Sequence, residues 1–243
     1  IGLHSRDTSN LIKVLKELVA AQKTGTPATV DDQFIAALQK VLENRTLNLA
    51  LAAITVKLPT ASYLAELYPD GTVDVDAIHA AIRQTEQAIG QRLETLLLER
   101  FHESRSTERR PYAWNKADVA ERAMKNTVLY YLVAGNPARY LELALTQFDH
   151  NQNMTDVRNA LRLILDYAEP AICQTTLETF YKEHKENPLA MTQWFTDQAL
   201  ADRPEVLSQV KALLKHPCYN PKNPNAVRAL IGGFSSNSVY FHK

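Results

Sequence analysis

The chain has 243 residues, and its 27 Lys and Arg balance its 27 Asp and Glu, so the formal net charge is zero. This balance excludes a global positive field that would attract nucleic acid or an anionic membrane. Hydrophobic residues make up 45% of the chain. No apolar run approaches the roughly 18 residues of a membrane span. We therefore expect a globular protein with no nucleic-acid partner and no membrane partner.

Two cysteines, Cys173 and Cys218, lie far apart in the sequence and outside any metal-ligand spacing. We expect both to be reduced thiols, which is typical of a cytoplasmic protein. Only seven glycines are present, whereas a β-rich or doubly wound fold needs many tight turns. The composition therefore favours helices over strands.

Apolar residues recur at helical spacing through the first hundred residues. A cluster of N-cap residues at 7–10 predicts the start of a helix that breaks at Gly25-Thr26-Pro27. Residues 46–56 are apolar nearly all round, which is typical of an inner helix. Pro69-Asp70-Gly71 is typical of a turn. From Val75 to Phe101 the apolar residues follow in steps of three and four, which predicts one amphipathic helix of about seven turns.

Beyond a charged, solvated loop at 103–111, proline punctuates the chain. Asn115 is typical of the N-cap of a helix that runs to Gly135. Further helix starts are predicted at Asn136-Pro137, Glu169-Pro170, Asn187-Pro188, Arg203-Pro204 and Asn223-Pro224. Short links between helices make neighbours antiparallel, and a series of them stacks into a curved array. We predict an all-α fold, an irregular superhelical solenoid of stacked antiparallel helices of the armadillo or HEAT type.

The segment from Asn223 to Phe234 is the most clearly delimited of these helices. Asn223 can accept a backbone hydrogen bond as N-cap, and Pro224 suits the first helical position. Gly232-Gly233 would supply the left-handed residues that end a helix. The sequence therefore predicts a short helix with a firm start and a defined end.

Arg228 is the candidate functional residue of this helix. Val227, Leu230 and Ile231 are predicted to form its apolar face, and Arg228 falls outside that face. Its cation is thus held at a defined place, although most arginines in such positions are simply solvated. A solvated surface residue and a binding residue are both compatible with the pattern.

No catalytic or metal-binding motif is found in the sequence. His102-Glu103 would begin an H-E-x-x-H zinc motif, but Ser106 stands where the second histidine is required. Asp31-Asp32 lacks a further carboxylate, and Cys173 lies in an amphipathic segment where packing is favoured over nucleophilic chemistry. We therefore predict no catalytic residue, no metal ligand and no cofactor in this chain.

Four segments carry a resemblance to a known family. They are Leu58-Pro-Thr-Ala-Ser-Tyr-Leu-Ala-Glu-Leu67, Tyr131-Leu-Val-Ala-Gly135, Asn153-Met-Thr-Asp156 and Asn223-Pro-Asn-Ala-Val-Arg-Ala-Leu-Ile-Gly232. The third is also explained as a helix cap, with Asp156 three residues after Asn153. In this order and at these separations, the four segments resemble the C-terminal α-helical domain of bacterial aminopeptidase N, a zinc-dependent alanyl aminopeptidase of the gluzincin class.

The resemblance implies a non-catalytic role for residues 1–243. In that family the zinc and the catalytic residues lie in an upstream domain, and the C-terminal domain closes over the active site and forms a channel and chamber for peptides. The implied partners are therefore the catalytic domain of the same parent chain and peptide substrates. Arg228 matches an arginine that lines the channel, where a guanidinium could bind the carboxylate of a short peptide.

The sequence departs from the family pattern at both ends. Its first predicted helix has no Trp, and it stops just after Phe241-His242, where the family continues through further helices. We expect a single C-terminal helical domain that is truncated at both ends relative to a longer parent chain. A free-standing helical-repeat scaffold that binds another protein is the alternative, and an all-α enzyme with an unrecognised site is a third.

Overall fold

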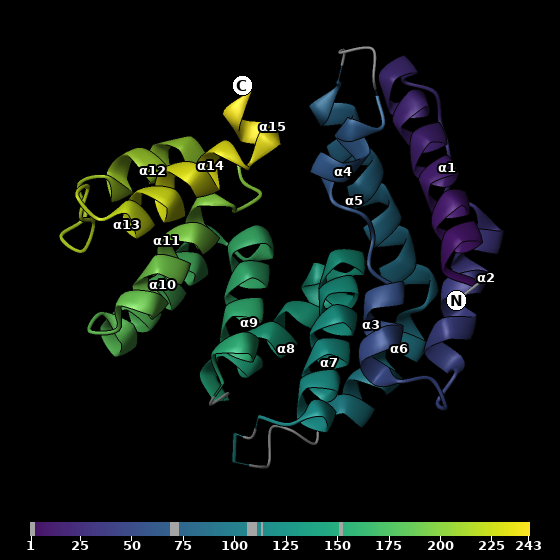
Figure 1. The fold of residues 1–243 in the computed structure, drawn as a ribbon, viewed down its shortest axis with the longest axis horizontal. Coiled ribbons are helices and arrows are strands. Elements are labelled where there is room, and N and C mark those ends of the chain that lie inside the picture. The colour runs from purple at the N-terminus through teal and green to yellow at the C-terminus, as the bar shows by residue number, and fades with distance from the viewer. Residues whose placement is uncertain (1–2, 69–72, 106–110, 113, 151–152) are drawn as a thin grey trace. The chain divides into compact units, whose positions relative to one another are not determined.

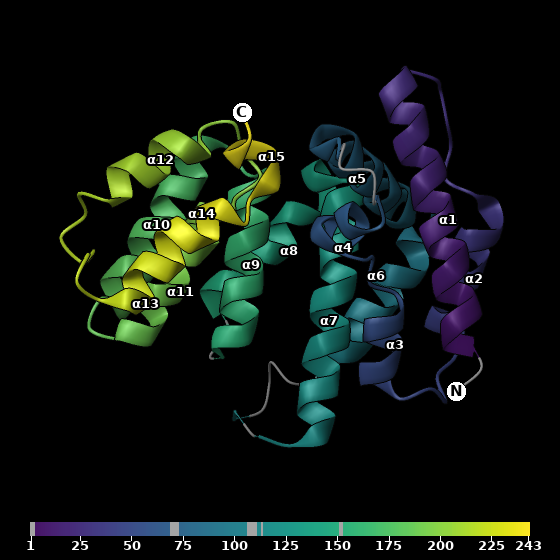
Figure 2. The same ribbon diagram turned by 45° about the horizontal axis from the view of Figure 1, so that its top comes forward.

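The computed structural model describes residues 3–68, 73–105, 111–112, 114–150 and 153–243 (Figures 1 and 2). These residues form helices and include no strand, which confirms the predicted all-α class. Residues 69–71 and 106–110, within the predicted turn and charged loop, lie outside the described residues. The chain divides into two compact units, unit 1 from Ile1 to Tyr140 and unit 2 from Leu141 to Lys243. The single-domain expectation stays a prediction.

Unit 1 is built around one buried helix, α7. Its helices are α1 (Leu3–Thr24), α2 (Asp32–Glu43), α3 (Leu49–Thr55), α4 (Ala61–Glu66), α5 (Val75–Arg92), α6 (Glu94–Glu103) and α7 (Lys116–Gly135). α3, α5 and α6 all pack on α7, and α1 packs on α5. Asn115 caps α7 as predicted, since its side chain accepts a hydrogen bond from the N–H of Asp118 at 2.9 Å.

Two helices occupy the region where the sequence predicts one, so the prediction of a continuous helix from Val75 to Phe101 is wrong. α5 ends at Arg92, and α6 begins at Glu94. Leu93 between them has φ −108° and ψ 15°, outside the helical range. No proline or glycine stands at Leu93 itself, and Gly90 lies within α5. The two helices both pack on α7.

α3 is less buried than its composition suggests. Asn48 caps it by accepting hydrogen bonds from the N–H groups of Ala50 and Leu51, and only one face packs on α7. On the other face Leu51 is 48% exposed and Ile54 is 60% exposed. The prediction of an inner helix over residues 46–56 is therefore wrong. An apolar run all round a short helix does not require burial on every side.

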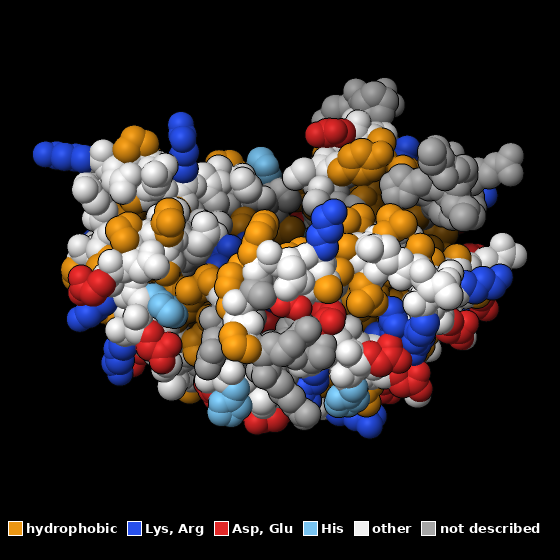
Figure 3. All heavy atoms as spheres, turned by 60° about the horizontal axis from the view of Figure 1, so that its bottom comes forward, with side chains coloured by type: hydrophobic (Ala, Val, Ile, Leu, Met, Phe, Trp, Pro, Cys, Tyr) orange, Lys and Arg blue, Asp and Glu red, His pale blue; other side chains and the backbone are white. Residues whose placement is uncertain are grey.

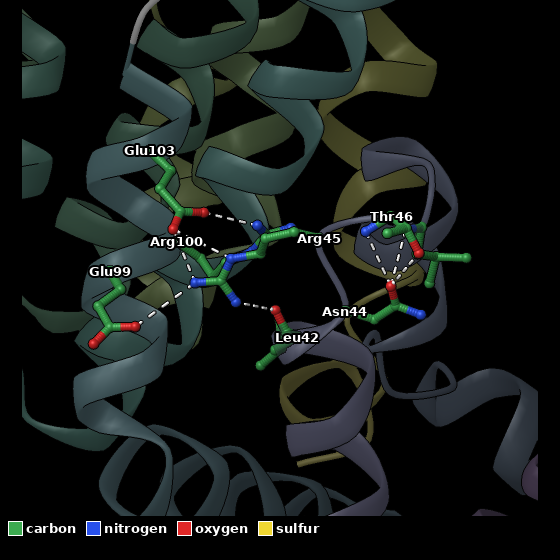
Figure 4. A network of polar contacts seen from close by, with 8 residues as sticks. Leu42, Asn44, Arg45, Thr46, Glu99, Arg100 and Glu103 are labelled. Atoms are coloured by element: carbon green, nitrogen blue, oxygen red, sulfur yellow. Dashed lines mark hydrogen bonds and ion pairs between the residues drawn. The ribbon is translucent and has the colours of Figure 1, made fainter.

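An ion-pair network fastens the α2–α3 loop to α6 (Figure 4). Arg45 donates to Glu103 from Nε at 3.2 Å and from Nη2 at 2.8 Å, and its Nη1 donates to the carbonyl of Leu42 at 2.9 Å. Arg100 donates to the same carboxylate from Nη1 at 2.7 Å. Arg45 thereby caps the end of α2 while it binds α6.

Unit 2 is arranged around α11. Its elements, with α8 crossing the boundary between the units, are α8 (Pro137–His150), α9 (Met154–Tyr167), α10 (Pro170–His184), α11 (Pro188–Ala199), α12 (Val206–Leu213), α13 (Pro224–Val227), the π-helix η2 (Arg228–Gly232), α14 (Gly233–Ser235) and α15 (Ser238–Phe241). α9, α10, α12, η2 and α14 all contact α11. Proline begins four of these elements as predicted, whereas α12 begins two residues after Pro204.

Candidate functional site

The segment that carries Arg228 is firmly anchored at its start. Asn223 accepts a hydrogen bond from the N–H of Asn225 at 3.0 Å, and Pro224 is the first residue of α13. The predicted N-cap and the predicted proline position are both confirmed. This start fixes where the following residues emerge along the surface of unit 2.

A π-helix follows immediately, and Arg228 is its first residue. The N–H of Gly233 donates to the carbonyl of Arg228, five residues back. The helical backbone continues through Gly232 and Gly233, whose φ values are −63° and −57°, and then into α14. The prediction that the two glycines end the helix in left-handed conformation is wrong. Gly233 instead permits close packing, because a Cβ there would lie 3.1 Å from the Cβ of Ala199 on α11.

The residues of this segment that face the core differ from those predicted. Ala229 and Leu230 are buried, whereas Ile231 is 42% exposed, so the predicted apolar face of Val227, Leu230 and Ile231 is only partly correct. The buried residues of the segment are Ala226, Ala229, Leu230 and Gly233, so the face that packs on the core is displaced by one residue from the predicted one.

Arg228 is exposed at the surface of unit 2. Within the described part of the chain, its side chain makes no hydrogen bond and no ion pair. Its guanidinium therefore has five N–H donors available for a ligand. π-turns occur frequently at functional sites because they redirect side chains. The channel-lining role of Arg228 stays a prediction.

Two other sequence features have structural roles. Asn153 accepts a hydrogen bond from the N–H of Asp156 at 2.9 Å and donates to its carboxylate at 2.8 Å, which confirms the predicted cap of α9. Cys173 is buried, and its thiol lies 3.2 Å from the carbonyl of Ile164 as a hydrogen-bond donor. Burial raises the pKa of this thiol, which makes it a poor nucleophile at neutral pH. Cys173 and Cys218 are both free thiols, as predicted.

The described residues provide no candidate metal centre: no group of three or more His, Cys, Asp or Glu in them could hold a metal ion. Within the same residues, no helix combines the length and the apolar character needed to cross a bilayer. On the face drawn in Figure 3, basic and acidic side chains are interspersed, and neither sign forms a continuous region. Such a mixed surface accords with the zero net charge of the chain.

An ion cluster in unit 2 was not predicted from the sequence. The carboxylate of Asp197 on α11 accepts hydrogen bonds from Arg158 and Arg162, both on α9. The two arginines are spaced i, i+4, which places them on one face of α9. Nothing in the sequence connects them with an aspartate 35 residues later. The cluster depends on the packing of α9 against α11, which only the structure provides.

A family profile described as "Domain of unknown function (DUF3458_C) ARM repeats" matches residues 8–243. Aminopeptidase N of Escherichia coli strain K12 is 30% identical over 96% of this chain and 26% of its own length. Aminopeptidase N of Haemophilus influenzae is 28% identical over 93% of this chain and 25% of its own length.

A solved structure also resembles nearly the whole chain. The crystal structure of Legionella pneumophila aminopeptidase A in complex with aspartic acid superposes with a TM-score of 0.82 at 25% identity, over 96% of this chain and 28% of that one. The chain thus spans about a quarter of the length of the relatives that it matches. The ARM-repeat description confirms the predicted class of all-α solenoid.

Proposed function

The chain belongs to the family of ARM repeats described as a domain of unknown function, DUF3458_C, and on this premise we propose that it is the non-catalytic C-terminal domain of a zinc aminopeptidase. The parent enzyme would remove N-terminal amino acids from peptides. This domain would cover the active site and form the channel and chamber through which peptides enter. Its partners would be the catalytic domain of the same chain, which holds the zinc, and the peptide substrates.

One observation carries the proposal. Nearly the whole chain aligns with relatives named aminopeptidase N, yet it covers only about a quarter of each. No H-E-x-x-H motif occurs in its 243 residues. A non-catalytic part of a longer peptidase accounts for both facts together. A free-standing scaffold is the alternative, and the reading frame upstream of Ile1 distinguishes them: an H-E-x-x-H motif there supports the peptidase.

Arg228 is the residue of this chain that we assign to substrate. It is exposed on a capped segment, and its donors have no acceptor among the described residues. In a partly enclosed channel, a guanidinium in this state would bind the terminal carboxylate of a short peptide through a charge-assisted bidentate pair. It would position the peptide without contacting the bond that is cleaved.

The test is the substitution Arg228→Ala in the intact parent enzyme, with tripeptides and tripeptide amides as substrates. We expect KM for the free tripeptide to rise severalfold while kcat changes little, because a positioning contact is lost. The amide, which has no terminal carboxylate, should show no such change. Lys222→Ala removes an exposed positive charge that precedes Arg228 in the sequence and serves as the control. Unchanged kinetics on free tripeptides would rule out the channel role of Arg228.

A further inference from the structure

The carboxylate of Asp197 is completely buried between two arginines of α9. Arg158 donates to it from Nε at 2.9 Å and from Nη2 at 2.7 Å, and Arg162 donates from Nε at 2.7 Å. The side chain of Asp197 has no exposed area, whereas that of Arg158 is 24% exposed and that of Arg162 is 50% exposed. The buried carboxylate of Asp197 therefore fixes two guanidinium groups that are partly exposed at the surface of unit 2.

The cluster carries an uncompensated positive charge. Two guanidinium groups share one carboxylate, and neither arginine has another ion pair with any residue that the structure describes. Two like charges one helical turn apart repel each other. Asp197 offsets this repulsion but neutralises only one of the two charges. An additional anion at the exposed side of the cluster would complete the charge balance.

The two arginines differ in the donors that they leave free. Arg158 donates to the carboxylate of Asp197 from both Nε and Nη2, which is the bidentate arrangement. Arg162 uses Nε alone, so its Nη1 and Nη2 have no acceptor among the described residues. This pair of nitrogens forms the end of the guanidinium fork, whose geometry matches the two oxygens of a carboxylate.

Asn159, beside the two arginines in the sequence, also has a donor without an acceptor. Asn159 follows Arg158 and precedes Arg162 by three residues, so it is adjacent to Arg162 on the helix surface. Its Nδ2 is buried and has no hydrogen-bond partner in the described part of the chain. A buried donor without an acceptor is unfavourable. This turn of α9 therefore combines a net positive charge with a buried donor that has no acceptor among the described residues.

From this geometry we propose that Arg158 and Arg162, positioned by Asp197, form a carboxylate-binding site on unit 2, in which the Nη1 and Nη2 atoms of Arg162 contact the ligand. The bound carboxylate is the end of a peptide or a small carboxylic acid. Asp197 is a positioning residue, because its carboxylate fixes the guanidinium groups and does not contact the ligand. The site does not depend on aminopeptidase activity, and it does not include Arg228.

The experiment is a titration of the complete 243-residue chain, followed by NMR at the Nε–Hε resonances of its arginines. The probes are acetate, N-acetyl-dialanine, the amide of that peptide, and sulfate. We expect saturable shifts at Arg158 and Arg162 with both carboxylates, with Kd of about a millimolar, and no saturable shift with the amide. Tighter binding of the peptide than of acetate identifies peptide ends as the ligand, and equal binding identifies the carboxylate group alone.

Three variants separate this site from a general charge effect. Arg162→Gln should weaken binding by about fivefold or more, and Arg162→Lys should do the same because an ammonium lacks the two-donor edge. Lys211→Gln removes an exposed charge from α12 and should leave binding unchanged. Thermal unfolding of each variant verifies that it is folded.

Several results would overturn the proposal. Binding that survives in Arg162→Gln places the ligand elsewhere. If Lys211→Gln weakens carboxylate binding as much as Arg162→Gln does, the effect comes from net charge and not from a site. Sulfate binding as tight as acetate binding contradicts a site selective for the carboxylate group.

Discussion

Gly90 of α5 and Gly135 of α7 pack backbone against backbone. A Cβ on Gly90 would lie 2.7 Å from the Cα of Gly135, and a Cβ on Gly135 would lie 2.7 Å from the Cα of Gly90. Real Cβ atoms do not approach a backbone this closely, and a packed interior has no room to accommodate the overlap. The contact sets the separation of two helices that form the centre of unit 1.

We predict that Gly90→Ala destabilises the protein by about 1–3 kcal/mol or more, because an added methyl group forces α5 and α7 apart. Urea or thermal unfolding followed by circular dichroism measures the change. Gly232→Ala is the matched control, since the nearest atom to a Cβ there is the Cβ of Arg228 at 3.9 Å. With that space, alanine should stabilise the helical backbone by up to about 1 kcal/mol. Equal effects of the two substitutions would contradict the close-packing argument.

Glu86 of α5 should make stability fall as pH rises. Burial raises the pKa of its carboxyl above the usual value and outweighs the charges of Arg83 and His79 and the hydrogen bond from Tyr130, which lower it. The Tyr130 hydroxyl donates to Glu86 at 2.5 Å. A raised carboxyl pKa means that the folded state holds the proton more tightly than the unfolded state. Stability is therefore lost as pH rises from the usual carboxyl range through the raised pKa.

The variant Glu86→Gln tests this prediction, because glutamine remains neutral throughout. We expect the free energy of unfolding of the variant, relative to the unmodified chain, to increase between about pH 4 and about pH 7. Urea unfolding at a series of pH values measures the difference. A difference that stays constant, or that decreases with pH, would show that the buried carboxyl is not disfavoured in its ionised form.

Glu103 of α6 should have the opposite pH dependence. Partial burial raises the pKa of its carboxyl, but the hydrogen bonds and charges of Arg45 and Arg100 outweigh this and hold the pKa below its usual value (Figure 4). Its stabilising effect is thus present above the usual carboxyl pKa and is lost as pH falls. Glu103→Gln should destabilise the protein at neutral pH, and the loss should diminish on acidification. Glu99→Gln, which removes only the 3.6 Å contact to Arg45, should have a smaller effect.

Local signals in the sequence were reliable where a single residue determines the outcome. Asn115, Asn153 and Asn223 cap their helices as predicted because an N-cap depends on hydrogen bonds within one turn. Gly25, with φ +65°, ends α1 as predicted, because glycine has no Cβ and adopts this left-handed conformation readily. The start of α1 was predicted wrongly, since the cap-type residues 7–10 lie within the helix.

Features that depend on packing between distant segments were not predictable. The break at Leu93 joins two helices that both contact α7, and the burial of Asp197 follows from the contact of α9 with α11. The π-turn at Arg228 also lacks a sequence signal, because Gly232-Gly233 is equally typical of a helix end. The sequence thus identified Arg228 as a candidate but placed Ile231, three residues on, on the wrong face.

The isolated chain should neither bind zinc stoichiometrically nor cleave alanyl substrates. Catalytic zinc in peptidases requires three protein ligands, typically two histidines one helical turn apart and a carboxylate. His102 has Ser106 at the position of the second histidine, and no described cluster of His, Cys, Asp or Glu could replace this ligand set. Elemental analysis after zinc loading and dialysis measures the metal, and release of nitroaniline from alanine p-nitroanilide measures activity. Stoichiometric zinc or hydrolysis by the pure chain would place a catalytic centre within these residues and contradict the proposed division of roles.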